Sequence, residues 1–470
     1  ALVGKIAGAQ ISSVDGTPGA KTNILLRGIN TISNGTHPMI LFDGVELGTT
    51  DISTLDMNSI ERVEVVQGAA AASIYGAQGA NGVIQLFSKK GKAGAKTKID
   101  FSSSYAVSSL INQGDVHKAR FHSYKTDASN NVIDAAGNII QLSAAGTYSG
   151  VTWANAAGSF VSAMGNPKNI MNKPYGQNLK YYDKYAQLFQ SAPAINNSLS
   201  ISGANGKSDY ALRFSNFHQE SNIRWNGYVD RSNFTSNVGT EIVKGLKFRS
   251  ITQLVYTKST LNPAFGVGGF NSTTLLTNGL YYLNNITPFY DLTQTLADGV
   301  SFPKRLTTGT VSVNGDNPFY RLSNEIGLGK TIDIFQNLQL DYKLNHFVEL
   351  DAKYGINYEK QNQVNIFKNQ TQNPNVLRFS SYVGSFNVND ASGEYDNFDY
   401  ATTSQNLLLT TYIKTDFQKD FHSKLPITTN TQLSYDFRKR TFNQLLTYGI
   451  GLPLYPIYNM NQTASQGVVA

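Results

Sequence analysis

The sequence predicts an all-β membrane protein built mainly from long antiparallel strands. Charged residues make up only 15% of the 470 residues, whereas Tyr and Phe contribute 26 and 25 residues. Several segments alternate between apolar and polar residues over about ten positions, as membrane strands with one lipid-facing side do. Short turns and long polar loops follow one another along the chain. This order is typical of outer-membrane β-barrels, with short periplasmic turns and long extracellular loops.

Composition alone leaves a soluble β-sandwich open, because such proteins share the weak charge and the aromatic content. No run of about 18 apolar residues is present, so no membrane-spanning helix is predicted. The formal net charge of +7 is spread along the chain without a basic cluster, so we expect no nucleic-acid partner. The absence of cysteine excludes disulfides and thiolate metal sites.

The clearest strand pair lies between residues 332 and 359. Side chains alternate faces along a strand, and this predicts a lipid-facing and a lumen-facing set in the first strand. The lipid-facing set is Ile332, Leu338, Leu340 and Tyr342, and the lumen-facing set is Asp333, Asn337, Gln339 and Asp341. Strands of about ten residues or more suit a tilted membrane strand and exceed what a sandwich needs. The prediction is therefore a barrel.

We expect about nine such strands within residues 95–470, separated by long loops at about 109–193, 259–330 and 362–402. Large plugged outer-membrane barrels have about 22 strands. A nine-stranded open sheet would leave two unpaired edges in lipid, which the bilayer does not allow. The sequence is therefore expected to hold the N-terminal part of a larger antiparallel barrel.

The first 94 residues have a different pattern, centred on Ile60 to Lys92. A strand, a short small-residue turn of helix at Ala69 to Ala72 and a second strand are expected there. Gly76, Gly79 and Gly82 suit a tight chain reversal, with at least one of them at positive φ. Their spacing is not the G-x-G-x-x-G dinucleotide fingerprint, and Ala93 after Gly91-Lys92 excludes a P-loop.

Three blocks of this region resemble the plug domain of TonB-dependent outer-membrane transporters, especially the SusC/RagA-like branch. They are Leu26 to Ile29, Ile40 to Val45, and Ile60 to Lys92, in the order and spacing of that family. The positions that carry the plug motif are Arg27, Gly28, Asp43, Gly44, Tyr75, Gly76, Gly79, Asn81 and Gly82. The resemblance covers about the first ninety residues.

The resemblance implies a small α/β plug domain at residues 1–94, followed by the N-terminal portion of the transmembrane barrel at residues 95–470. It implies TonB-dependent active import of a bulky nutrient, a glycan or an oligopeptide, across the outer membrane of a Gram-negative bacterium. The implied partners are TonB, a SusD-like surface lipoprotein that covers the barrel, and outer-membrane lipid. One alternative stays open: a plugged barrel that serves as an accessory subunit of a larger assembly without transport of its own.

Four charged residues of the plug, Arg27, Glu61, Arg62 and Glu64, have two interpretations. They are either solvated surface charges or, as the resemblance implies, polar contacts between plug and barrel. A plug that rests in place yet shifts on demand needs contacts that are individually modest. We therefore expect at least two of the four to lie within hydrogen-bonding reach of the barrel wall.

No pattern of catalytic residues is present, so we expect neither an enzyme nor a cofactor. The six histidines form no H-E-x-x-H motif, and no G-x-S-x-G motif occurs. No metal site is predicted, although one loop gathers four carboxylates that are a minor calcium candidate beside ordinary solvation. These are Asp390, Glu394, Asp396 and Asp399. The loops rich in Tyr, Asn, Gln and Asp suit sugars or peptides but equally suit solubility, so substrate-binding residues are unknown.

Overall fold

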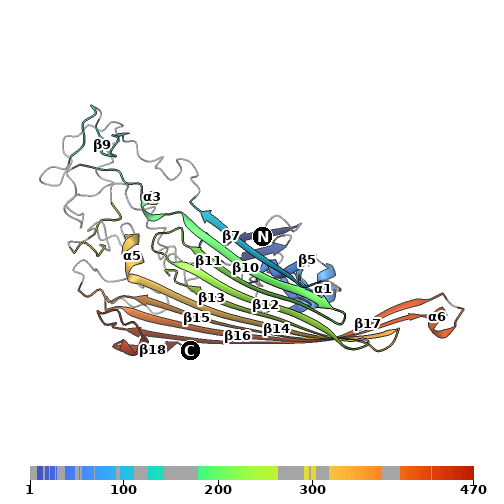
Figure 1. Cartoon of the computed structure of the whole chain (residues 1–470). Helices are drawn as coiled ribbons and strands as arrows, with labels where there is room; N and C mark the ends of the chain where they lie inside the picture. The colour runs from blue at the N-terminus through green and yellow to red at the C-terminus, as the bar shows by residue number, and fades with distance from the viewer. Residues whose placement is uncertain are drawn as a thin grey trace.

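The protein is described by a computed structural model (Figure 1). The described residues are 8–13, 16–20, 22–26, 28, 37–47, 52, 55–67, 69–91, 96–110, 125–134, 136–141, 178–262, 291–295, 298–302, 317–372, 392–424 and 426–469. They form a small N-terminal unit, the plug, and one large curved sheet, the wall. Figure 1 shows the blue plug lying on one face of the wall.

The plug is built on a four-stranded sheet in the order β4-β3-β6-β5. β3 (Met39–Phe42) and β4 (Val45–Glu46) form a hairpin, and β6 (Val83–Ser88) runs parallel to β3 and antiparallel to β5 (Ile60–Val66). A separate hairpin joins β1 (Ala9–Ser13) to β2 (Thr22–Leu26). Asp43 and Gly44 turn the β3–β4 hairpin with φ of 48° and 85°, which is the predicted hairpin turn.

The glycine-rich reversal between β5 and β6 has the predicted tight backbone. Gly76 and Gly82 have φ of 67° and 89°, where a side chain is unfavourable. A Cβ on Gly79 would lie 2.6 Å from the carbonyl oxygen of Ala71. The helix before them, α1 (Ala69–Tyr75), is longer than predicted and continues into η3 (Gly76–Gly79). The alanine run favours helix, so the helix persists until glycine ends it. A single turn, η2 (Met57–Ser59), precedes β5.

The wall is a ten-stranded antiparallel sheet in the order β18-β17-β16-β15-β14-β13-β12-β11-β10-β7. Nine of its strands are long, which matches the predicted number. They are β7 (Lys98–Ser108), β10 (Ala192–Asn205), β11 (Ser208–Glu220), β12 (Tyr228–Val243), β13 (Leu246–Ser259), β14 (Glu325–Lys343), β15 (Val348–Phe367), β16 (Glu394–Asp416) and β17 (Thr428–Ile450). The tenth, β18 (Ser465–Val469), is short. No described helix is long and apolar enough to cross a membrane.

The faces of β14 alternate as predicted. Asp333, Asn337 and Gln339 are buried, and the last two donate hydrogen bonds to backbone carbonyls of the plug. Ile332, Leu338 and Leu340 are exposed on the opposite face. The plug therefore covers the lumen face, and an apolar face is left for lipid.

Two predicted loops are shorter than expected, because the strands continue beyond their apolar alternation. β14 begins at Glu325, within the predicted loop 259–330. β15 runs to Phe367 and β16 begins at Glu394, both within the predicted loop 362–402. On the outward face of this extension Asn362 donates to both Asn397 and Asp399. The backbone ladder continues there, but polar side chains such as Asn362 and Asp399 interrupt the apolar alternation, which hides the strand from a hydropathy pattern.

The long connections lie at one end of the wall and the short turns at the other (Figure 1). The long-connection end carries β8 (Lys125–Thr126), β9 (Val132–Ile133), α3 (Lys184–Leu188) and α5 (Pro318–Asn324). The hairpin of β16 and β17 reaches far past the plug and bears α6 (Phe417–Phe421) at its tip. A last turn, η7 (Met460–Gln462), precedes β18.

Cysteine labelling tests the faces of β14. In membranes, Asp341→Cys should react with a water-soluble thiol reagent, because this face opens to the lumen beyond the plug. Leu340→Cys should react only with a lipid-soluble reagent, because this face meets lipid. The chain has no other cysteine to interfere. Reversed labelling would show that the register of β14 is wrong.

The close contact at Gly79 predicts that Gly79→Ala destabilises the plug by about 1–3 kcal/mol, since the added methyl meets backbone that cannot rotate away. Gly16→Ala is the matched control, because nothing lies within 4 Å of a Cβ at Gly16. Protease resistance of the plug in folded barrels measures the effect. Equal resistance of the two variants would show that Gly79 is only a spacer.

Candidate functional site: the interface between plug and wall

One register row of the wall carries much of the contact with the plug. Strand pairing aligns one lumen-facing residue from each of six consecutive strands, β12 to β17. We call these residues the seat row: Asn237, Ile251, Asn337, Gly355, Asn406 and Arg438. Because register fixes which residues stand side by side, a straight band of the wall is presented to the plug.

The β3–β4 hairpin of the plug rests on the middle of the seat row. Asn337 donates through Nδ2 to the backbone oxygen of Asp43 at 3.4 Å, and Gln339 donates to the same oxygen at 2.9 Å. Val45 packs against Gly355, where a Cβ would collide with the valine side chain. Glycine at this position therefore lets the hairpin approach the wall backbone.

An ion pair fixes the end of the same hairpin to β17. Arg438 lies 3.1 Å from a carboxylate oxygen of Glu46 and also bonds the side-chain oxygen of Gln78 in η3. The guanidinium is itself held by Asp436. Burial raises the pKa of the Glu46 carboxyl, and the positive charge of Arg438 opposes that rise.

A second ion pair holds the plug to β11 at the other side. Asp56, the N-cap residue of η2, accepts from Arg213 Nε at 2.6 Å and from the Ser215 hydroxyl at 2.9 Å. The Arg213 and Asp56 side chains are 13% and 6% exposed, so water screens this pair weakly. This interaction, well shielded from water, joins the plug to the wall.

The end of β6 is held to β12. Asn237 donates to the Ser88 hydroxyl at 2.6 Å and to the Lys89 backbone oxygen at 3.2 Å. The backbone N–H of Ser88 in turn donates to the carboxylate of Asp43. Burial raises the pKa of the Asp43 carboxyl above its ordinary value, and the bonds from Ser88 oppose that rise.

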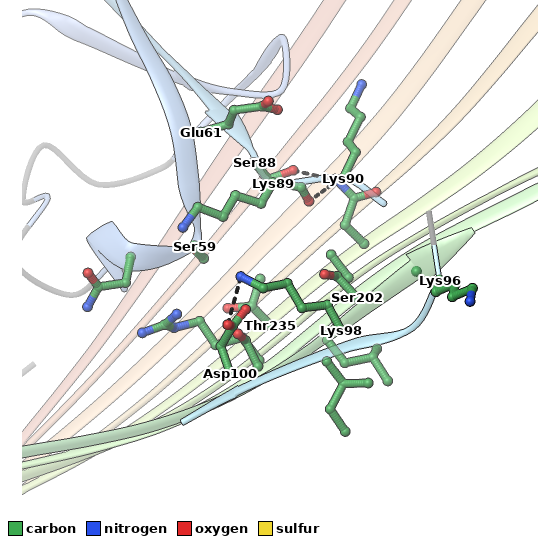
Figure 2. Close-up of a pocket in the computed structure, with 18 residues that line it drawn as sticks. Ser59, Glu61, Ser88, Lys89, Lys90, Lys96, Lys98, Asp100, Ser202 and Thr235 are labelled. Atoms are coloured by element: carbon green, nitrogen blue, oxygen red, sulfur yellow. Dashed lines mark hydrogen bonds and ion pairs between the residues drawn. The ribbon is translucent and has the colours of Figure 1, made fainter. Parts of the chain in front are cut away.

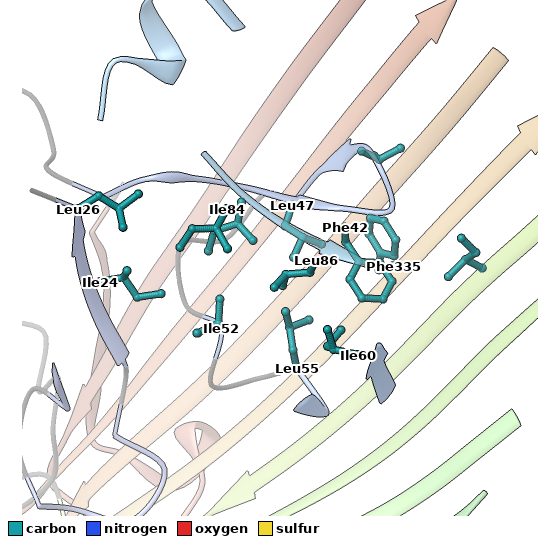
Figure 3. Packing of buried hydrophobic residues seen from close by; sticks show 13 residues of the cluster. Ile24, Leu26, Phe42, Leu47, Ile52, Leu55, Ile60, Ile84, Leu86 and Phe335 are labelled. Carbon is teal, nitrogen blue, oxygen red and sulfur yellow. The ribbon is translucent and has the colours of Figure 1, made fainter. Parts of the chain in front are cut away.

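The apolar contact between plug and wall is small. Within the described residues, the main hydrophobic cluster consists of plug residues together with Ile251 and Phe335 of the wall (Figure 3). The rings of Phe42 and Phe335 pack edge to face, 5.3 Å apart. The plug therefore has its own core and adds only two apolar wall residues to it.

A cavity of about 450 Å³ lies between the plug and the wall, lined by residues of β7, β10, β11 and β12 (Figure 2). The plug contributes Glu61, Ser88, Lys89 and Lys90 to its lining. The wall side of the lining includes Lys98 and Asp100, which form an ion pair at 2.7 Å, and Arg213. The plug is thus bonded to β11, β12, β14 and β17 but leaves a space beside β7 and β10 whose lining includes several charged side chains.

The structure describes three of the four predicted contact residues, and within the described residues none of these three bonds the wall. Arg27 falls outside the described residues. Glu61 lines the cavity, whereas Arg62 and Glu64 pair with each other at 2.8 Å on exposed parts of β5. Arg62 also covers the ring of Phe87 at 3.9 Å. The plug contacts the wall instead through Asp43, Glu46, Asp56, Gln78 and Ser88. A wall pairing of Arg27 stays a prediction.

The remaining motif residues have structural positions in the plug. Gly28 has φ of 97°, and the Tyr75 hydroxyl accepts from Gln85 at 2.8 Å. Asn81 donates to the backbone oxygen of His37 at 3.5 Å. These contacts are internal to the plug and shape its turns.

The calcium candidates separate in space. Asp390 falls outside the described residues, and β16 places Glu394 and Asp396 on its buried face. Asp399 lies on the opposite face, bonded to Asn362 and Asn397. The expectation of one four-residue loop is therefore wrong, because a strand alternates its side chains.

Sequence comparison relates the chain to known receptors. Residues 1–83 match the model of the TonB-dependent Receptor Plug Domain. TonB-dependent receptor SusC of Bacteroides thetaiotaomicron is 34% identical over 122 residues, which are 24% of this chain and 12% of that protein. TonB-dependent receptor P3 of Formosa agariphila is 24% identical over 87% of this chain and 34% of that protein.

Comparison with solved structures shows that this fold is similar to that of a known transporter. The RagAB peptide transporter superposes on 100% of this chain with a TM-score of 0.69 and 17% identity, over 49% of that chain. The chain thus matches about half the length of that structure, and 12% and 34% of the length of the two curated relatives. The match includes both the plug and the wall.

The buried Asp56–Arg213 pair predicts a looser plug when one member is removed. Asp56→Ala leaves the Arg213 charge poorly compensated, which costs on the order of 3 kcal/mol of plug docking. The variant should let a large hydrophilic antibiotic leak through assembled barrels. Glu64→Ala is the control, because its exposed pair with Arg62 contributes about 0–1 kcal/mol. Equal permeability of the two variants would contradict the assignment.

Proposed function

Because this chain belongs to the SusC/RagA-like TonB-dependent receptors, we propose that it imports a bulky nutrient actively across a Gram-negative outer membrane. The observation that carries the proposal is the seating of the plug. Separate polar contacts on β11, β12, β14 and β17 hold it, together with two apolar wall residues. Such contacts keep the lumen closed at rest and can be broken one at a time.

The distribution of these contacts also favours one direction in which the plug would move to open the lumen. A pull on the plug by TonB from the periplasm would act at the end of the wall with the short turns. The cavity beside β7 and β10 means that the plug meets less resistance on that side. Breaking the Asp56–Arg213 and Ser88–Asn237 contacts would enlarge this space into a path for hydrophilic cargo.

The end of the wall with the long connections is suited to bind cargo and a covering lipoprotein. There Trp225, which is 62% exposed, packs against Phe302 and Phe319 at 5.5 and 5.1 Å. Its φ of 60° is unusual for a bulky residue, and the buried Asn226 beside it bonds Ser221 and Asn262. An exposed indole held in this way offers an apolar platform to a peptide or a sugar ring. We propose that a SusD-like lipoprotein covers this end.

The cargo class proposed is an oligopeptide or a glycan. The fold similarity to a peptide transporter favours the first. The second stays open because the resemblance to the SusC/RagA-like family implies either cargo. Both are large and hydrophilic, so passive entry through a closed plug is excluded by size. Transport therefore requires that the plug shift.

A disulfide lock tests whether transport needs plug movement. Ser88→Cys combined with Asn237→Cys introduces two thiols at positions whose side chains now bond each other, with 2.6 Å between Oγ and Nδ2, in a chain without natural cysteine. Uptake of fluorescent casein peptides and of labelled oligosaccharides should require the gene and TonB. At least one of them should fall about tenfold in the oxidised variant and recover with reductant.

The single-cysteine variants are controls and should transport normally. Uptake of both probes that is unaffected by deleting the gene would favour the accessory-subunit alternative. Uptake that needs the gene but persists in the oxidised double variant would show that these plug segments stay on the wall during transport.

A further inference from the structure

Two carboxylates at the start of β16 are buried on one face of the wall. Glu394 is 3% exposed and Asp396 is 0% exposed. They are two residues apart in a strand, so both side chains point the same way. Register places Glu394 opposite Phe367 and Asp396 opposite Asn365 on β15. Phe367 and Phe398 are each 2% exposed, so aromatic rings flank the pair.

Three of the four oxygens of these carboxylates lack a donor among the described residues. Neither oxygen of Asp396, nor Oε1 of Glu394, has a hydrogen-bond partner there. The two side chains project from the same buried face of β16, so their charges lie on the same side of the strand. Two ionised carboxylates are both acceptors, and burying such charge without compensation is strongly unfavourable. A positive species between them would remove that cost.

We propose that Glu394 and Asp396 form a binding site for a hard divalent cation, with Ca²⁺ as the ion that fits. Carboxylate oxygens are ligands that Ca²⁺ prefers, and Asn365 brings an amide group to the same face. Within the described residues, no group of three or more His, Asp or Glu side chains converges. Amide, backbone and water oxygens therefore complete the shell, and the absence of cysteine disfavours soft metals.

The position gives the cation a structural role. The pair directly follows the long connection from β15 to β16, at the end of the wall that carries the long connections. Gly393 precedes it with φ of 89°, and a Cβ there would lie 2.8 Å from the Asn369 backbone nitrogen. The connection thus returns close to its own start at this point. A bound Ca²⁺ would fix the base of the connection, whatever cargo is transported.

Calcium content of the purified protein tests the site. Wild type, the double variant Glu394→Gln with Asp396→Asn, and the control Asp399→Asn are dialysed against about 10 mM CaCl₂, well above the expected Kd, and analysed by mass spectrometry. Asp399 is the matched control because it lies on the opposite face of the same strand. Wild type and control should hold one Ca²⁺ per chain more than the double variant, with Kd on the order of 10⁻⁴–10⁻³ M.

Equal calcium in all three proteins would overturn the proposal. A shared proton would be shown instead if the unfolding midpoint of wild type followed pH but not Ca²⁺. If the double variant does not fold, Tb³⁺ bound to wild type decides the question. Tyr448 lies opposite Asp396 on β17 and should sensitise Tb³⁺ emission that excess Ca²⁺ removes. Absence of Ca²⁺-sensitive emission would equally overturn the proposal.

Discussion

The alignment of one residue from each of six wall strands is the constraint on which the rest of the structure depends. Hydrogen-bonded register places Asn237, Asn337 and Arg438 on one line across the lumen face, although 201 residues separate the first from the last. The plug needs only short edges, the β3–β4 hairpin and the end of β6, to contact this line. The pairing of the wall strands therefore positions the contact residues, and the plug binds to them.

This arrangement reconciles two demands on the plug. It must have a folded core of its own, and it must be separable from the wall. The core is formed mainly by apolar residues of the plug itself, such as Phe42, Ile84 and Leu86. The wall adds Ile251 and Phe335 to it. The remaining attachment is by hydrogen bonds and ion pairs, which water can replace when the plug shifts. The more shielded pair at Asp56 and Arg213 then contributes more than the exposed pair at Arg62 and Glu64.

The sequence predicts local structure well and contacts poorly, for a physical reason. The Asp43-Gly44 turn, the positive φ of Gly76 and Gly82 and the faces of β14 follow from neighbouring residues, so pattern reveals them. The bond between Ser88 and Asn237 joins residues 149 positions apart and depends on the register of every strand between. Charge alone singles out Arg62 and Glu64, which pair with each other. Asp56 does not stand out in the sequence, because an aspartate before a helical turn is explained by capping that turn.

The ends of β15 and β16 illustrate a second limit. Alternation of apolar and polar residues indicates that one face of a strand meets lipid. The alternation stops where the wall leaves the membrane. The ladder continues there, and the buried carboxylates Glu394 and Asp396 resemble loop residues in sequence. Only their placement on one buried strand face shows that their negative charges need a compensating positive charge.

The seat row also constrains how such a chain can change in length. Insertion or deletion of one residue between a short turn and the row would rotate that strand by one pleat and turn its seat residue away from the plug. Such changes are incompatible with docking on β12 to β17. Residues added beyond the row, in the connections at the opposite end, leave the alignment intact. The receptor can therefore acquire new outer surfaces by lengthening those connections while the same plug continues to fit.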